Sequence, residues 1–209
     1  MTNYKVVVLD MDDTLLNSDN VISEETANYL TAIQDEGYYV VLASGRPTEG
    51  MIPTARDLKL PEHHSFIISY NGSKTINMTN EEVEVSKSIG KQDFDEIVDY
   101  VSNITEARID LNGVFNDNVD ATTSKPFFLE FMAKDVSKGN AIKALCQKLG
   151  YSVDQVIAFG DSMNDKSMFE VAGLAIAMGN ASDELKQYAD EITLDHNENG
   201  IPHALKKLL

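Results

Sequence analysis

Residues 5–14 read KVVVLDMDDT, a short apolar run that leads directly into a cluster of acids. The run is rich in β-branched residues and too short for a helix, so it predicts a buried strand from Lys5 to Leu9. The acids at its end, Asp10-Met11-Asp12, are weak evidence by themselves, because turns and helix caps also use aspartates at this spacing. Their meaning depends on the rest of the chain.

The same strand-then-polar pattern occurs twice more. Val40–Ala43 is followed by Ser44-Gly45-Arg46, and Val156–Phe159 is followed by GDSMND, residues 160–165. Alone, Asp161 could be only an N-cap for the helix that follows it. Between such runs lie amphipathic stretches, an alternation that predicts βαβ units and an α/β fold with a parallel sheet flanked by helices. We expect strands at 5–9, 38–43, 66–69, 155–159 and 174–178. We expect helices at 23–36, 138–149, 165–172, 182–188 and 201–209, and one more that ends near Leu58.

The middle of the chain has a different character. Residues 74–78 and 83–88 are predicted to form an antiparallel hairpin, and Phe94, Ile97, Val98 and Val101 mark one face of a helix. A buried strand is predicted for Phe127–Met132, whereas 103–124 shows little periodicity. We therefore expect residues 75–130 to be an inserted α+β cap, and residues 1–74 and 131–209 to form the core.

The composition limits the possible partners. The 209 residues include 34 acids and 17 bases, giving a formal net charge of -17 and a pI near 4.4, a field that argues against nucleic acid and anionic membranes as partners. A phosphate site in such a chain would need a compensating cation. The one cysteine, Cys146, lies in an apolar stretch, and no apolar run is long enough for a membrane span, so we expect a cytoplasmic protein.

In parallel sheets, ligands bind beyond the carboxyl ends of the strands, where Asp10, Asp12 and Asp161 should meet. Carboxylates gathered there repel one another unless protons or a cation neutralise them, and oxygen ligands favour a hard ion such as Mg²⁺, with Asp10 and Asp161 as direct ligands. Zinc is not expected, because the histidines lack ligand spacing and lie in loop-like or terminal segments. We expect these four residues to be solvated: His63, His64, His196 and His203.

Lys138 is the remaining informative residue. It stands near a predicted helix N-terminus, where the helix dipole disfavours a cation, so an anionic group should lie nearby. A lysine that extends along the surface is the alternative. A phosphate-facing ammonium would also supply the compensation that the acidic chain requires.

Four segments together resemble the motifs of the haloacid dehalogenase-like hydrolase superfamily, in particular its Cof-type phosphatases. DMDDTL, SGR, VSKGNA and GDSMND stand in the order of that family, at residues 10–15, 44–46, 136–141 and 160–165, and span nearly the whole chain. The resemblance implies a Rossmann-like core with a C2B-type cap inserted after the third strand.

The resemblance also implies roles for single residues. Asp10 would be the nucleophile that forms an aspartyl phosphate, and Asp12 the general acid and base. The phosphoryl group would be held by Met11, Ser44, Gly45, Lys138 and Asn164. The metal site would comprise Asp10, the backbone carbonyl of Asp12, Asp161 and Ser162, with Asp165 and Arg46 in support and Asn71 and Gly72 as possible substrate contacts. This interpretation requires the side chains of residues 10, 12, 138 and 161 to surround one divalent ion.

Two features depart from the family pattern. Asp13 stands where many relatives have glycine, for which we expect a neutral effect. The predicted cap of about 55 residues is also short for the subfamily. Either the cap is reduced, or a piece near residues 102–108 is missing from the chain.

The expected activity is hydrolysis of a small phosphate monoester, such as a sugar phosphate or a similar metabolite, by a monomer or weak homodimer. Two alternatives stay open. A phosphotransferase or mutase would use the same aspartyl phosphate, and a non-catalytic protein would keep the site only to bind a phosphometabolite.

Overall fold

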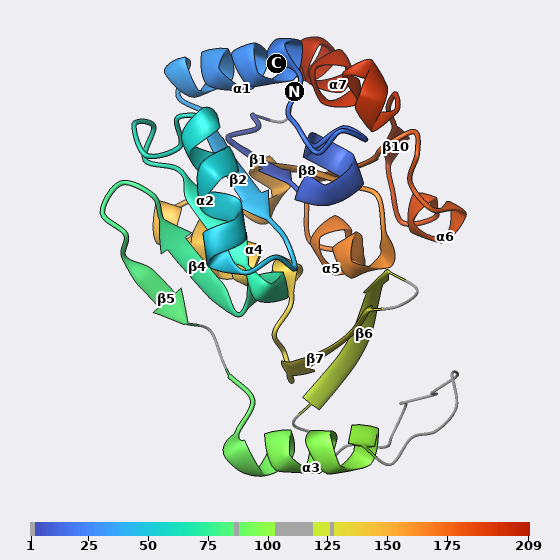
Figure 1. Cartoon of the computed structure of the whole chain (residues 1–209). Helices are drawn as coiled ribbons and strands as arrows, with labels where there is room; N and C mark the ends of the chain where they lie inside the picture. The colour runs from blue at the N-terminus through green and yellow to red at the C-terminus, as the bar shows by residue number, and fades with distance from the viewer. Residues whose placement is uncertain (1–2, 86–87, 103–118, 126–127) are drawn as a thin grey trace.

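The computed structural model describes residues 3–85, 88–102, 119–125 and 128–209. These form an eight-stranded sheet, flanking helices and a separate two-stranded ribbon (Figure 1). The strands of the large sheet, in spatial order, are β10 (Glu191–Ile192), β9 (Leu174–Ala177), β8 (Val156–Gly160), β1 (Val6–Leu9), β2 (Tyr39–Ala43), β3 (Phe66–Ser69), β4 (Lys74–Asn77) and β5 (Val83–Val85). The ribbon consists of β6 (Val119–Lys125) and β7 (Phe128–Ala133).

The sheet is parallel from β10 to β3, as the alternation of runs predicts. β1 lies in its centre with Leu9 paired to Leu42 on one side and Phe159 on the other, and its four residues have no exposed surface. Strands later in the chain extend the sheet to both sides of β1, so the chain reverses its direction of winding there. Such a switch point is where open α/β sheets bind ligands, beyond the carboxyl ends of the strands.

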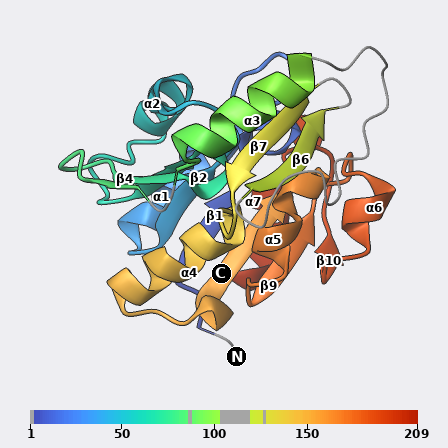
Figure 2. The ribbon, with the colours of Figure 1, turned by 90° about the horizontal axis from the view of Figure 1, so that it is seen from below.

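The helices agree with the predicted positions, although several are shorter. Ser23 caps the first helix by accepting a hydrogen bond from the Thr26 amide at 3.1 Å, and Gly37 follows its end with φ +91°. The first helix packs against the last, and α4 (Lys138–Leu149) packs against α5 (Lys166–Phe169) (Figures 1 and 2). The helices are α1 (Glu24–Asp35), α2 (Thr48–Asp57), α3 (Lys91–Ser102), α4 (Lys138–Leu149), α5 (Lys166–Phe169), α6 (Asp183–Lys186) and α7 (Gly200–Leu208).

The predicted hairpin forms, but it belongs to the large sheet. β4 pairs antiparallel with β3, through Ile68 and Thr75, and β5 continues on its outer side. Ile76 is 6% exposed, so this strand packs into the core, which a local pattern cannot reveal. The large sheet thus includes residues that we assigned to the cap, and the division of the chain into core and cap stays a prediction.

The other middle elements lie apart from the sheet. α3 and the β6–β7 ribbon occupy the end of the molecule opposite α1 and α7 (Figure 1). On α3, Ile97 is buried, but Phe94 and Val98 are 57% and 46% exposed, so the predicted apolar face is only partly covered. The predicted gap near residues 102–108 falls almost wholly outside the described residues. Among these, no helix is long and apolar enough to cross a bilayer.

Candidate active site

Three carboxylates meet at the carboxyl end of the central strands. Asp10 follows β1, and its amide donates to the Phe159 carbonyl of β8 at 3.0 Å, which joins the two strand ends. Asp161 follows β8, and Asp165 lies in the short helical turn Met163–Asp165. Asp10, Asp161 and Asp165 each offer an oxygen within 4.8 Å of the others. The structure therefore brings together the acids of two motifs that are 150 residues apart.

Lys138 joins this group as the balancing cation. Its Nζ lies 2.6 Å from Asp10 Oδ1 and 2.6 Å from Asp165 Oδ1, and its side chain has no exposed surface. It is the first residue of α4, whose N-cap, Ser137, accepts from the Asn140 amide. Burial lowers the pKa of Lys138, but the two carboxylates outweigh that effect and hold its pKa above the ordinary value. The expected anionic partners of Lys138 are confirmed.

One ammonium does not balance three acids. Burial and then the charge of Asp165 raise the pKa of Asp10 to about 7, although Lys138 opposes the shift. Burial and then the charges of Asp10 and Asp165 raise the pKa of Asp161 to about 8, against a hydrogen bond from Thr14. A divalent cation among these oxygens would remove this excess negative charge, and oxygen donors are the ligands that Mg²⁺ takes. The donor set thus fits the expected metal.

Asp165 is the most enclosed of the three acids. It has no exposed surface, and its second oxygen accepts from the amides of Asp161 and Ser162 at 3.0 and 3.3 Å. A Cβ on Gly160 would lie 2.6 Å from that oxygen, which explains the glycine at this position. Asp165 therefore anchors the loop that carries Asp161, as a supporting carboxylate would.

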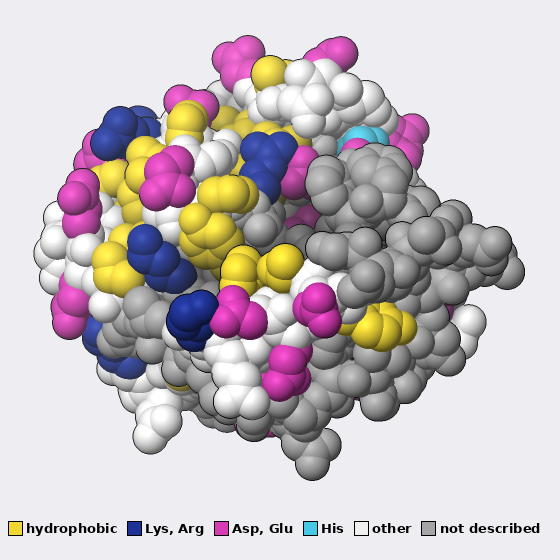
Figure 3. Space-filling model, turned by 60° about the horizontal axis from the view of Figure 1, so that its bottom comes forward, with side chains coloured by type: hydrophobic (Ala, Val, Ile, Leu, Met, Phe, Trp, Pro, Cys, Tyr) yellow, Lys and Arg dark blue, Asp and Glu magenta, His cyan; other side chains and the backbone are white. Residues whose placement is uncertain are grey.

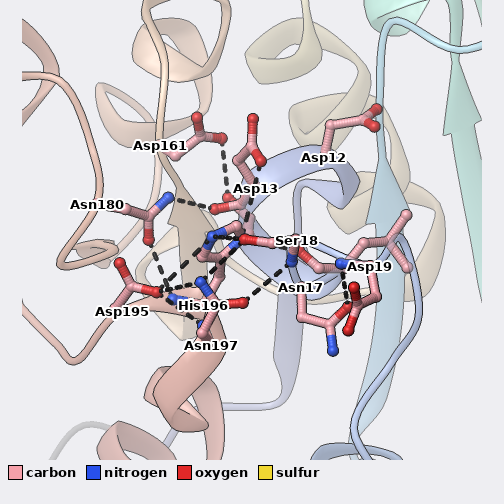
Figure 4. A network of polar contacts seen from close by, with 12 residues as sticks. Asp12, Asp13, Asn17, Ser18, Asp19, Asp161, Asn180, Asp195, His196 and Asn197 are labelled. Atoms are coloured by element: carbon pink, nitrogen blue, oxygen red, sulfur yellow. Dashed lines mark hydrogen bonds and ion pairs between the residues drawn. The ribbon is translucent and has the colours of Figure 1, made fainter.

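Asp12 is placed differently from our expectation. Its carboxylate accepts from Arg46 Nε at 2.8 Å and Nη2 at 2.5 Å, and it points away from Asp161 (Figure 4). It is not one of the three clustered acids, so the prediction that the side chain of residue 12 surrounds the ion with 10, 138 and 161 is wrong. The guanidinium of Arg46, which lies in the loop after β2, orients the Asp12 carboxylate toward itself through two hydrogen bonds. The implied metal contact of Asp12 involves its carbonyl and is unaffected.

The loop after β2 and the loop after β3 support each other. The Ser44 hydroxyl accepts from the Arg46 amide at 3.1 Å, and the Ser44 carbonyl accepts from the Asn71 amide at 3.0 Å. Gly72 has φ +105°, and a Cβ there would lie 2.2 Å from the Ser137 carbonyl. Only glycine lets this turn lie so close to the start of α4. The Asn-Gly pair therefore stands where the loop after β3 packs against Ser137.

The remaining predicted residues border the same region. The Met11 side chain is fully buried in the core, so only its backbone faces the site, where its amide donates to Asp10. The Ser162 hydroxyl donates to Asn164 Oδ1 at 2.6 Å. A cavity of about 610 Å³ is lined by both Asn164 and Lys138.

A second cavity, of about 500 Å³, lies beside Gly45. Apolar and aromatic side chains, among them Tyr70, Ile89 and Phe131, line it together with Lys74. Asn71 and Met132 border both cavities, so the two adjoin. The space-filling view shows hydrophobic side chains gathered beside Lys and Arg around a hollow on this side of the molecule (Figure 3).

Three residues around the turn Met11–Leu15 were not predicted to belong to the site. Thr14 donates to Asp161 Oδ1 at 3.0 Å, Asn180 Nδ2 donates to the Asp13 carbonyl at 2.7 Å, and His196 Nδ1 lies 3.0 Å from the Leu16 carbonyl (Figure 4). His196 is 8% exposed, so the expectation that it is solvated is wrong. Thr14 stands inside a motif and could have been found there, whereas nothing near Asn180 or His196 in the sequence indicates these contacts.

Asp13 itself has φ +59° and ψ +12°. This left-handed conformation is one that glycine adopts freely and that aspartate tolerates better than most residues. Either a glycine or an aspartate therefore suits this position of the turn.

Comparisons with known proteins agree with this geometry. The sequence model of the haloacid dehalogenase-like hydrolase family matches residues 7–111 and 101–205. The chain is 30% identical to a Bacillus subtilis 5-amino-6-(5-phospho-D-ribitylamino)uracil phosphatase, covering 98% of this chain and 95% of that protein. The alignment runs over 246 positions against 209 residues here, so this relative has interior residues that the chain lacks.

Two solved structures have the same fold. A haloacid dehalogenase-like hydrolase from Bacteroides thetaiotaomicron is 28% identical, with a TM-score of 0.86 over 99% of this chain and 100% of that one. A sugar phosphatase of subclass IIB of the same superfamily is 21% identical, with a TM-score of 0.84 over 98% of each chain, a likeness of fold.

The chain belongs to the haloacid dehalogenase-like hydrolase family. Within that family it is of the Cof type, and it is a phosphoric monoester hydrolase.

Proposed function

We propose that the chain is a Mg²⁺-dependent phosphatase that hydrolyses small phosphate monoesters through a phosphorylated Asp10. The observation that carries the proposal is the contact of Asp10 with Lys138 at 2.6 Å, at the carboxyl end of the central strand, beside two further carboxylates. A carboxylate is a weak nucleophile, so it needs a partner that neutralises the phosphate and fixes an in-line approach. Lys138 is placed to be that partner.

Asp10, Asp161 and the carbonyl of Asp12 are the groups that would hold the metal. Asp165 is already engaged by Lys138 and two amides, which favours an indirect role for it. Ser162 would contribute from the same loop. Bound Mg²⁺ would offset the charge of the carboxylates and of the incoming phosphate.

The phosphoryl oxygens would be bound by polar groups of the loops at this end of the sheet. These are Lys138 Nζ, the Ser44 hydroxyl, the backbone amides of Met11 and Gly45, and Asn164. Backbone amides and an ammonium held in fixed positions give a local positive potential. This potential offsets the repulsion of a bound phosphate by a chain of net charge -17.

Asp12 is proposed to give a proton to the leaving alkoxide and to take one from the water that later attacks the phosphorylated Asp10. In the structure Arg46 holds its carboxylate by two hydrogen bonds. The side chain of Asp12 would therefore have to turn from Arg46 toward the substrate in each half of the reaction. Its exposure of 35% leaves room for that rotation.

The leaving group would occupy the cavity beside Gly45. A volume of about 500 Å³ suits a small metabolite, and Lys74 with the neighbouring polar groups offers partners for hydroxyl or anionic substituents. Two similar proteins, a 5-amino-6-(5-phospho-D-ribitylamino)uracil phosphatase and a sugar phosphatase, support polyol or sugar phosphates as substrates here. We propose that the protein acts on such metabolites in the cytoplasm. We also propose that it is a monomer or a weak homodimer.

Replacing the nucleophile tests the proposal. Asp10→Asn keeps the shape of the side chain but removes its charge, so we expect Mg²⁺-dependent phosphate release from a panel of sugar phosphates to fall below detection. Mass spectrometry of rapidly quenched wild-type protein should find a phosphoryl group on Asp10. Asp19→Asn, on the loop that follows the same turn, is the matched control and should retain activity. Phosphate release that survives Asp10→Asn would overturn the proposal.

A further inference from the structure

The turn that carries Asp12 is held from outside by side chains distant in sequence. Asp12 is extended at φ -71° and ψ 128°, and Asp13 is left-handed, so the turn Met11–Leu15 departs from helical geometry. The Asp13 carbonyl instead accepts from Asn180 Nδ2 at 2.7 Å, across 167 residues. Figure 4 shows the Asn180 side chain reaching this turn from the loop that follows β9.

The orientation of the Asn180 amide is fixed by its partners. Its Nδ2 faces a backbone carbonyl, which can only accept, and its Oδ1 faces the His196 backbone amide at 3.1 Å, which can only donate. Both ends of the amide are therefore used, and a shorter side chain could not join the two. Asn180 connects the turn after β1 to the segment around His196.

His196 contacts the chain directly after the turn, at Leu16. Its Nδ1 lies 3.0 Å from the Leu16 carbonyl, and a carbonyl only accepts, so Nδ1 carries the hydrogen in this contact. The nearly buried ring is also 3.4 Å from the Ser18 hydroxyl. Asn180 and His196 thus fix the carbonyls of residues 13 and 16, on either side of Thr14.

The same loop is tied to the opposite side of the metal-binding group. The Ser182 amide donates to the Asp161 carbonyl at 2.9 Å, while the Thr14 hydroxyl donates to the Asp161 carboxylate at 3.0 Å. Through its two connections, the loop that carries Asn180 sets the turn after β1 relative to Asp161. These are the two segments that would supply ligands to one ion.

We propose that Asn180 is a positioning residue for the metal site, which acts by fixing the Asp13 peptide and hence the Asp12 carbonyl and Thr14. His196 assists by receiving Asn180 and holding Leu16. This inference rests on the proposed Mg²⁺ site. Groups behind the ligands of a metal typically contribute 10–100-fold to its affinity, because they hold the ligands in the binding geometry.

Direct metal titration tests the inference. In Asn180→Ala, we expect the dissociation constant for Mg²⁺, measured by calorimetry on the substrate-free protein, to rise roughly 10–100-fold. The increase in melting temperature on adding Mg²⁺ should shrink accordingly. Asn197→Ala is the matched control: Asn197 bonds Ser18 and Asp195 in the same network but does not touch the turn at Asp13, and its Mg²⁺ affinity should equal that of the wild type.

The outcomes separate the inference from the function on which it rests. Wild-type protein that binds no Mg²⁺ would reject the proposed metal site itself. Wild-type binding with unchanged affinity in Asn180→Ala, even with a lower melting temperature, would reduce Asn180 to a purely structural role and overturn the inference. If Asn180→Ala does not fold, Asn180→Ser, which keeps a polar group but cannot span both partners, provides the same comparison.

Discussion

The ammonium of Lys138 lies 2.6 Å from the Asp10 carboxylate, although the residues are 128 positions apart and both are buried. A lysine at a helix start is unfavourable by itself, and a carboxylate with 4% exposure is costly by itself. The opposite charges of the pair offset the cost of burying each group, and the pair lies at the carboxyl end of the parallel strands. Stability and chemistry therefore depend on the same contact.

Removing the ammonium should damage both. Lys138→Met leaves Asp10 and Asp165 without their cation, so we expect a loss of roughly 3–5 kcal/mol in the free energy of unfolding, measured with urea, and no detectable phosphatase activity. Lys91→Met, the control, breaks an exposed pair with Asp95 and should leave the urea midpoint almost unchanged. Equal stability of the two variants would show that Lys138 does not balance the buried acids.

The raised pKa values predict a pH dependence in metal-free protein. The pKa of Asp161 rises from 3.8 to about 8 on folding and that of Asp10 to about 7, so the folded chain keeps protons that the unfolded chain has released. Stability from these groups is complete below pH 3.8 and is lost as pH rises through 7 and 8. In EDTA, the melting temperature of the wild type should fall over pH 5.5–8.5 more steeply than that of Asp161→Asn.

Added Mg²⁺ should oppose this loss, because it replaces the protons on the carboxylates, and its stabilising effect should therefore grow with pH. A wild-type curve parallel to that of Asp161→Asn would contradict a raised pKa of Asp161.

The contact between Arg46 and Asp12 predicts a dependence on the leaving group. Arg46→Met removes the two hydrogen bonds that fix where the Asp12 carboxylate rests between its turns toward the substrate, so the acid loses its defined starting position. We expect kcat for an alkyl phosphate, which needs a proton on its leaving oxygen, to fall by about tenfold, less than the roughly 10²–10⁴-fold that loss of the general acid itself would cause. Hydrolysis of p-nitrophenyl phosphate, whose leaving group departs without a proton, should change less.

Arg56→Met, on the exposed side of α2, serves as the control and should leave both rates unchanged. Equal losses on both substrates in Arg46→Met would instead place Arg46 in phosphate binding.

Local pattern was sufficient for the strands and helices that build the sheet. β3 has the predicted bounds, and α1 with its caps Ser23 and Glu36 spans the predicted range 23–36, because a buried run or a cap is encoded in a few adjacent residues. The two-residue β10 was missed, since both of its residues are exposed and too few to form a pattern. The hairpin was found, but its place in the large sheet depends on pairing with β3.

The sequence by itself determined which chemical groups stand at the ends of the strands, because strand patterning and the residues that follow each strand are local. It also predicted an anion near Lys138. The directions of the groups on the turns depend on tertiary contacts. The Asp12 carboxylate is turned toward Arg46, 34 residues away, and the Asp13 carbonyl toward Asn180, 167 residues away. A turn has no periodicity that fixes its side chains, so their direction is set by whichever distant segments pack against it.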